Sequence, residues 1–243
     1  MNATRVDALR VAVLAGLLLL SVSLPELWAI GLRPLFPRID VLVYDRTPFP
    51  ALLAEHARLV FLSSGLAAFC GVGLGVIVTR PWGRDFLPAV DSLAAVGQTI
   101  PPVAVLAMAV PVLGFGARPA IFALFLYGLL PILRNALAGI SSTPHAVREA
   151  AIGMGMTDLQ ILGRIELPLA WPVILAGIRT SVIINIGTAA IGAAIGAGGL
   201  GAPIVAGVTG ENPAWILEGS VIAGLFALLT DSGLALLAGS RGR

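Results

Sequence analysis

The chain has 243 residues, a mean hydropathy of +0.97 and only 12% charged residues, which excludes a water-soluble globular domain because its surface would expose large apolar patches. All 15 basic residues are Arg and the net charge is +2, so we expect neither a nucleic-acid partner nor a phosphate-binding loop that needs Lys. One cysteine, Cys70, excludes an intrachain disulfide, and His56 and His145 are too isolated to predict a metal site.

Six apolar runs are candidate membrane spans, since crossing a bilayer takes about 20 mostly apolar helical residues. The sequence therefore predicts an all-α polytopic membrane protein with about six transmembrane helices. The predicted spans are 9–32, 57–79, 86–113, 119–133, 172–195 and 216–238.

The first span is also similar to a secretory signal. Arg5 and Arg10 precede it, and residues 21–23 have the small-x-small pattern of a cleavage site. Apolar residues continue beyond Pro25, which favours an uncleaved anchor. The segment that follows, rich in Pro and charge, is expected to be an extracytoplasmic loop, either a plain connector or a contact for an extracytoplasmic partner.

The distribution of Arg predicts the orientation, because short cytoplasmic loops collect positive charge. If the amino terminus is inside, loop 134–168 with its three Arg residues is cytoplasmic, as are both termini. Fewer Arg residues fall on the opposite, extracytoplasmic side, so the distribution of Arg along the whole chain is consistent with this orientation.

A proline pair interrupts the third span. Pro101 and Pro102 remove backbone hydrogen bonds, so the helix must kink or unwind where protein or a cavity covers it. With the neighbouring Gln98 and Thr99, the pair is a candidate element of a pathway or gate; a kink that serves packing alone is equally compatible with the sequence.

Glycine clusters occur in one predicted loop and within predicted membrane spans. The stretch "GAGGLG" (196–201), with Gly198 and Gly199, cannot form a stable helix interior and is expected to be an extracytoplasmic loop or re-entrant turn, either a gate or a plain turn. Glycines four apart in "GVGLG" (71–75) and "GAAIG" (192–196) predict close approach between helices.

Loop 141–168 contains signals for two short helices. Thr143 is expected to cap the first, with Pro144 at its first position, and the helix extends to about Gly153. Gly153 and Gly155 permit a reversal of the chain.

The second helix starts near Thr157 or Asp158 and is expected to end at Pro168, before the next span. Its apolar face consists of Ile161, Leu162 and Ile165. The loop is thus predicted to be a helix-turn-helix at the cytoplasmic surface, and a purely structural hairpin is the alternative to a functional one.

This loop resembles the EAA loop of permease subunits from ABC importers that use a binding protein. The resemblance rests on seven residues within twenty, which are Glu149, Ala150, Ala151, Gly155, Ile165, Leu167 and Pro168. In that family the loop forms coupling helices that dock into a groove on the ATPase subunit, and the attached spans exchange inward-open and outward-open states.

The resemblance implies a type I importer permease core over residues 55–238, with the coupling loop at 141–168. Residues 1–54 would be an anchor helix with an extracytoplasmic loop, and 239–243 a short cytoplasmic tail. The implied partners are an ABC ATPase dimer, a second permease that is a copy or a relative, and a solute-binding protein at the bacterial inner membrane. This chain would be non-catalytic and bind no cofactor, because ATP and Mg would be bound by the ATPase.

Further segments look like the subgroup that imports osmoprotectants, with glycine betaine, choline and related quaternary amines as substrates. They are "AAVGQTIPPVAVLAMAVPVLGFG", "LYGLLPILRNALAGI" and "IGAGGLGAPIVAGV". The four Trp and two Tyr are scattered along the sequence, so no aromatic cage is predicted here and recognition would be a property of the binding protein.

Three other functions compete with this hypothesis. An importer for another small solute, such as an amino acid, would share the coupling loop. An ion-coupled secondary transporter is disfavoured because the middles of the spans contain almost no carboxylate or His. A membrane scaffold would have little need of a proline pair within a span.

Overall fold

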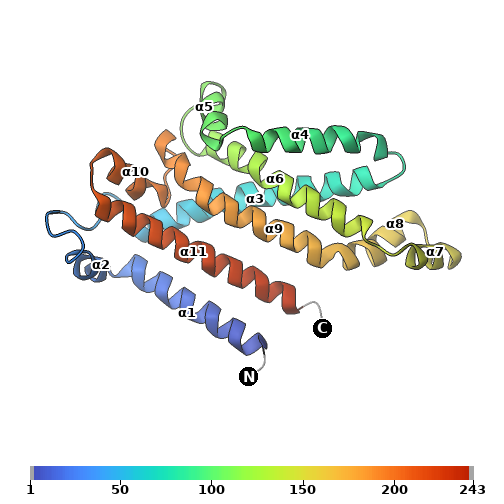
Figure 1. The fold of residues 1–243 in the computed structure, drawn as a ribbon, viewed down its shortest axis with the longest axis horizontal. Helices are drawn as coiled ribbons and strands as arrows, with labels where there is room; N and C mark the ends of the chain where they lie inside the picture. Colours follow the sequence, from blue (N-terminus) through green and yellow to red (C-terminus); the bar gives the residue numbers. More distant parts are fainter. Residues whose placement is uncertain (1–2, 241–243) are drawn as a thin grey trace.

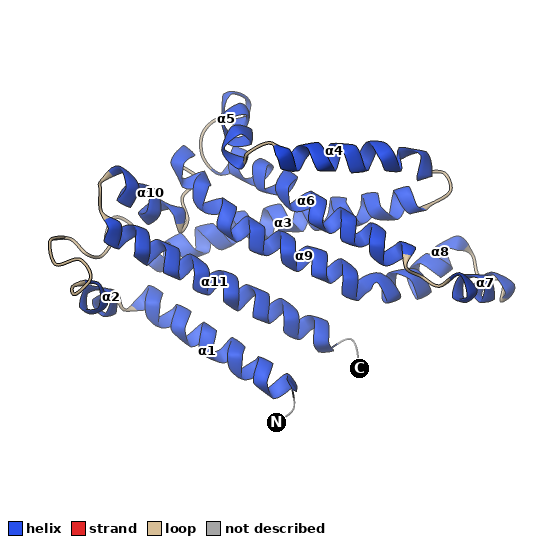
Figure 2. Ribbon diagram, viewed as in Figure 1, coloured by secondary structure: helices blue, strands red, loops and turns tan. Residues whose placement is uncertain are grey.

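A computed structural model describes residues 3–240, and every element of this part of the chain is helical (Figures 1 and 2). Five helices are long and apolar enough to cross a membrane, and a bent pair of helices makes up to six. The predicted all-α polytopic fold is therefore confirmed.

The first predicted span is wrong as a single helix. Helix α1 (Ala3–Ser23) ends before Pro25, where the short helix α2 (Pro25–Leu32) begins. Pro25 has no backbone N–H and disfavours the helical conformation at Leu24, which has φ −123° and ψ 80°. The Trp28 Nε1–H donates to the Ser21 carbonyl oxygen at 2.8 Å and holds the two helices across the break.

Three long helices form the centre of the bundle: α3 (Phe49–Thr79), α6 (Ala117–Ser141) and α9 (Leu167–Ala189). They lie side by side in Figure 1. Small residues allow this approach, because a Cβ on Gly75 would lie only 2.7 Å from the Ala136 Cβ, and one on Gly177 only 2.6 Å from the Asn135 Cβ. The close packing predicted from "GVGLG" is confirmed.

The third predicted span consists of two helices, α4 (Leu87–Thr99) and α5 (Pro102–Leu113). A one-turn helix, η1 (Arg84–Phe86), precedes them, and the two axes differ by 97°. The kink predicted at Pro101 and Pro102 is thus confirmed. The bend occurs there because Pro101 leaves Ile100 extended, at ψ 124°, and neither proline can donate a helical hydrogen bond.

Beyond α9 the chain forms a 3₁₀ segment, η3 (Ala190–Ile195), then a glycine turn, the short helix α10 (Gly201–Thr209) and the last long helix, α11 (Pro213–Ser240). The turn expected at "GAGGLG" is confirmed, since Gly196, Gly198 and Gly199 all have positive φ. Helix α1 contacts α11 at the edge of the bundle, away from α6.

The loop between α6 and α9 contains α7 (His145–Gly153) and α8 (Asp158–Ile161) at one end of the bundle (Figure 1). Helices α2 and α10 lie at the opposite end, which we call the far end. The chain ends of α1 and α11 point toward the same side as α7 and α8.

The glycine packing makes a testable prediction. We expect Gly75→Ala to lower the free energy of unfolding by about 1–3 kcal/mol, because the added methyl group would overlap Ala136. Gly73→Ala, two residues away with open space around it, should leave stability unchanged or raise it by up to about 1 kcal/mol. Unfolding of the detergent-purified protein measures both, and equal effects would contradict the packing.

Candidate coupling site

Helices α7 and α8 form a compact hairpin, residues 145–161, which we call the coupling hairpin. Its turn depends on Gly155, which has φ +79°, a conformation that residues with a Cβ rarely adopt. The Gly155 N–H donates to the Ile152 carbonyl oxygen at 2.9 Å, and the Met156 N–H to that of Ala151 at 3.1 Å. The reversal predicted at Gly155 is therefore confirmed.

Helix α8 starts at Asp158, as predicted, and a side chain caps its start, whereas the start of α7 has no such cap. The Thr157 Oγ1 accepts from the Gln160 N–H, and the Gln160 Oε1 accepts from the Thr157 N–H at 2.9 Å, which completes a capping box. At α7 the predicted cap by Thr143 is wrong. The chain is already extended at Pro144, which occupies the cap position of a helix that starts at His145, and no side chain caps it.

Pro168 does not end the second helix, contrary to the prediction. A π-helical segment, η2 (Leu162–Glu166), joins α8 to α9, so the helix is continuous over Asp158–Ile195. The Leu167 N–H donates to the Leu162 carbonyl oxygen, five residues back, and the wider turn accommodates the N–H that Pro168 lacks. The coupling hairpin is therefore a direct extension of a membrane-spanning helix.

The structure divides the seven predicted coupling residues into two groups. Those exposed on the hairpin and at the start of α9 are Glu149, Ala150, Gly155 and Pro168. Those that face the bundle are the fully buried Ala151 and the half-buried Ile165 and Leu167. Leu167 packs against the core formed by α6 and α9, so this second group anchors the hairpin rather than forming its surface.

The apolar face predicted for the second helix points inward. Ile161 is fully buried and Leu162 is half-buried. The outward surface has other apolar side chains that sequence reasoning missed, with exposed fractions of 56% for Ile152, 73% for Met154 and 81% for Leu159. Val147 is also exposed, at 40%, and several large apolar side chains on one small hairpin are typical of a surface that binds a protein partner.

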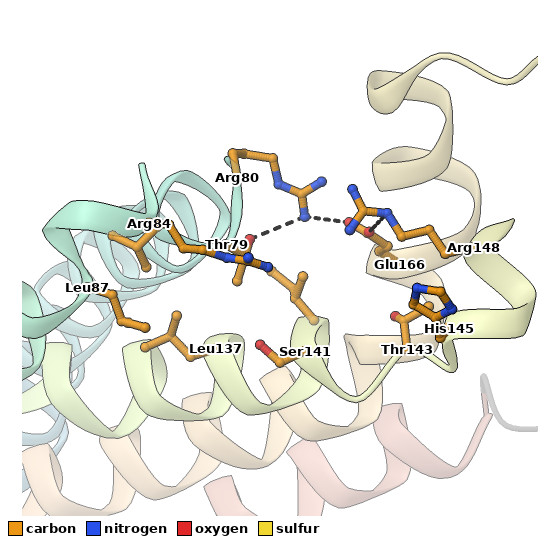
Figure 3. A pocket seen from close by; sticks show the side chains of 12 residues that line it. Thr79, Arg80, Arg84, Leu87, Leu137, Ser141, Thr143, His145, Arg148 and Glu166 are labelled. Carbon is orange, nitrogen blue, oxygen red and sulfur yellow. Dashed lines mark hydrogen bonds and ion pairs between the residues drawn. The ribbon is translucent and has the colours of Figure 1, made fainter. Parts of the chain in front are cut away.

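An ion-pair network holds the coupling hairpin against the bundle (Figure 3). The Glu166 carboxylate is only 3% exposed, and its Oε2 accepts from the Arg80 Nη2 at 2.5 Å. Its Oε1 lies 3.8 Å from the Arg148 Nε, and the Arg148 Nη2 lies 3.9 Å from the Asp158 Oδ1. One carboxylate thus connects the end of α3, helix α7 and the entry to α9.

The candidate pathway residues lie apart from the coupling hairpin. Thr99 is exposed at the end of α4, where its hydroxyl donates to the Val96 carbonyl oxygen at 2.8 Å. Pro101 is exposed and Pro102 half-buried at the bend before α5. Gln98 is in α4, and its side chain lies outside the described part of the structure.

The turn that contains Gly198 and Gly199 contacts α3 at the far end. The Gly199 N–H donates to the Glu55 Oε2 at 2.9 Å, and a Cβ on Gly199 would lie 3.0 Å from the His56 Nδ1. The His56 Nε2 is 3.0 Å from the Ile186 carbonyl oxygen, so the start of α3 also holds the end of α9. These contacts therefore fix the position of the glycine turn against α3.

Aromatic residues that are scattered in the sequence meet at the far end. Tyr44 packs edge-on against Trp215 at 5.5 Å and against Phe49 at 6.2 Å. The guanidinium of Arg46 lies 5.3 Å from the centre of the Trp215 ring, so a cation of the chain itself already occupies this ring face. The cluster therefore serves packing of the 33–48 loop.

Two further charges pair within the bundle. The Arg179 Nη2 donates to the Asp231 Oδ1 at 2.7 Å and the Arg179 Nε at 3.1 Å, which joins α9 to α11. Sequence reasoning missed this pair because the residues lie 52 positions apart.

The comparisons with known proteins agree with this geometry. The fold is that of an ABC importer permease: a chain of the MetNI methionine ABC transporter in an inward-facing conformation superposes with a TM-score of 0.70 at 25% identity, over 78% of this chain and 94% of that one. Residues 71–237 match the family described as the inner membrane component of binding-protein-dependent transport systems, and the chain belongs to this family.

Curated relatives include the osmoprotectant import permease protein OsmY of Salmonella typhimurium, 43% identical over 86% of both chains. The choline transport system permease protein OpuBB of Bacillus subtilis is 40% identical over 75% of this chain and 83% of its own. The glycine betaine/carnitine/choline permease protein OpuCD of the same species is 46% identical over 68% and 72%.

The buried ion pair makes a testable prediction. We expect Glu166→Gln to lower the free energy of unfolding by roughly 3–5 kcal/mol, because Arg80 would remain buried without a countercharge. The exposed pair Arg134–Asp91, 3.6 Å apart, provides the control, and Asp91→Asn should cost less than about 1 kcal/mol. Unfolding followed by tryptophan fluorescence distinguishes the two, and a small effect of Glu166→Gln would contradict a structural role for the network.

Proposed function

We propose that this protein is the permease subunit through which an ABC importer takes up an osmoprotectant, such as glycine betaine or a related quaternary amine. Relatives at 40–46% identity are named for osmoprotectant, choline, carnitine or glycine betaine transport, which supports this substrate class. The solved amino-acid transporters are less similar, at 21–25% identity, so an amino acid is the weaker candidate.

The coupling hairpin would dock on an ATPase subunit that binds ATP and Mg and hydrolyses ATP, while this chain binds no cofactor and carries out no catalysis. The observation that carries the proposal is the exposed apolar surface of Ile152, Met154 and Leu159 on a hairpin that continues into α9. Glu149 and Ala150 are exposed on the same hairpin, where a charge and a small side chain suit close contact with a partner.

The remaining parts of the importer follow from the same proposal. A second permease, identical or related, would complete the pathway, and a solute-binding protein would deliver the substrate at the far end. The protein would reside in the bacterial inner membrane with both termini and the coupling hairpin in the cytoplasm. Residues 55–238 would form the permease core, and Thr99, Pro101, Pro102, Gly198 and Gly199 would line or gate the pathway together with Gln98.

Replacement of Leu159 tests the docking surface. We expect Leu159→Glu to weaken association with the ATPase by about ten- to a hundredfold, because an apolar side chain worth about 1.5–3 kcal/mol on burial is lost. Gln160→Glu adds the same charge one residue away and keeps the capping box, so it should retain most of the affinity. Pull-down titration of the two subunits measures the difference, and equal binding by Leu159→Glu and the wild type would refute the surface.

Uptake assays test the substrate and the source of energy. In proteoliposomes that contain the ATPase, the permeases and the binding protein, we expect ATP-dependent uptake of glycine betaine or choline and no competition by methionine. Uptake of methionine but not of the quaternary amines would favour the amino-acid importer. Uptake that needs no ATP and collapses with an uncoupler would favour a secondary transporter.

A further inference from the structure

A polar cavity of about 350 Å³ lies between the coupling hairpin and the cytoplasmic-side ends of α3 and α6 (Figure 3). The polar and charged side chains that matter here are Arg80, Arg84, Thr143, Arg148 and Glu166. They come from the end of α3, the short helix η1, the entry to α7, α7 itself and the segment before α9. The cavity thus touches the ends of α3 and α6 as well as α7 and η2, which meet at the base of the hairpin.

Positive charge exceeds negative charge in this lining. Three guanidinium groups face a single carboxylate, Glu166, whose two oxygens are already engaged by Arg80 and Arg148. Arg84 forms no ion pair within the described residues. His145 also lines the cavity, and its Nδ1 lies 3.4 Å from the carboxylate of Glu149, an exposed residue that does not line the cavity.

Several buried polar atoms in the lining lack a hydrogen-bond partner. They are the Arg80 Nε, the Arg148 Nε and the Thr143 Oγ1. A guanidinium N–H can only donate, and an unsatisfied buried donor costs about 1–3 kcal/mol. A ligand that suits the guanidinium groups of this lining is therefore a hydrogen-bond acceptor.

We propose that this cavity binds a phosphate-type oxyanion, either the headgroup phosphate of an anionic lipid or a free phosphate ion. Guanidinium groups match the geometry of phosphate oxygens, and the lining supplies three of them against one carboxylate, with Arg84 in no ion pair of the described residues. The cavity lies at the ends of membrane-spanning helices, where basic pockets meet lipid headgroups. The bound anion bridges Arg80 and Arg84 with Thr143, just before the hairpin, and with Arg148 within it, and so stabilises the position of the hairpin whatever solute is transported.

Native mass spectrometry of the delipidated permease–ATPase complex tests this site. With phosphatidylglycerol and phosphatidylcholine of the same acyl chains, we expect preferential retention of phosphatidylglycerol, about one molecule per permease. Loss of a charge-assisted hydrogen bond in Arg84→Gln, or of the hydroxyl in Thr143→Val, should weaken retention roughly tenfold. Arg164→Gln, which removes an exposed Arg of the same loop outside the cavity, should bind like the wild type.

Inorganic phosphate distinguishes the two sources. If the lipid is the ligand, millimolar phosphate does not displace phosphatidylglycerol. If the free ion is the ligand, both lipids are retained equally, and calorimetry detects phosphate binding that weakens in Arg84→Gln and Thr143→Val. Either result supports the oxyanion site. Binding of neither anion would overturn the proposal, as would effects of these two substitutions no larger than that of Arg164→Gln. Anion binding that appears only after the ATPase is removed would also overturn it, because a side chain of the partner would then fill the cavity in the complex.

Discussion

The buried carboxylate of Glu166 is the constraint on which the coupling hairpin depends. A carboxylate with almost no access to water needs a countercharge, and Arg80 and Arg148 provide it from α3 and α7. Because η2 joins α8 to α9 without a break, the hairpin cannot rotate about Pro168 unless these ion pairs separate or the helix unfolds. A force applied to the hairpin by a partner is therefore passed to α9 as a whole.

Helix α9 connects this end of the bundle with the far end. Its last turns lie beside the start of α3, where His56 contacts the Ile186 carbonyl oxygen and Glu55 holds the Gly199 N–H. A displacement of α9 would thus reach the glycine turn directly, through contacts of about 3 Å. This geometry connects the coupling hairpin with the glycine turn at the far end, and no separate flexible linker lies between them in the described chain.

Features encoded locally could be predicted from the sequence. Gly155, the Thr157 capping box and the proline pair at 101–102 act through their own backbone geometry, so their positions were predictable. The wrong prediction at Pro168 also has a local cause, because a π-helical turn can compensate for the missing N–H of a proline. No signal in the sequence predicts such a turn. Features that depend on distant residues could not be predicted. Arg80 and Glu166 are 86 positions apart in the sequence, and Glu55 and Gly199 are 144 positions apart. The outward direction of Leu159 can be inferred only once Ile161 is known to be buried.

The central claim is that the coupling hairpin and α9 move as one body. Spin labels at Ala146→Cys in the hairpin and Ala176→Cys in α9, both exposed, in a chain with Cys70→Ser, measure this by pulsed electron paramagnetic resonance in the complex with the ATPase. The account predicts one narrow distance distribution that is the same with and without bound ATP, while transport remains ATP-dependent. A distribution that shifts or broadens between the two states would mean that the hairpin moves relative to α9, and would contradict the account.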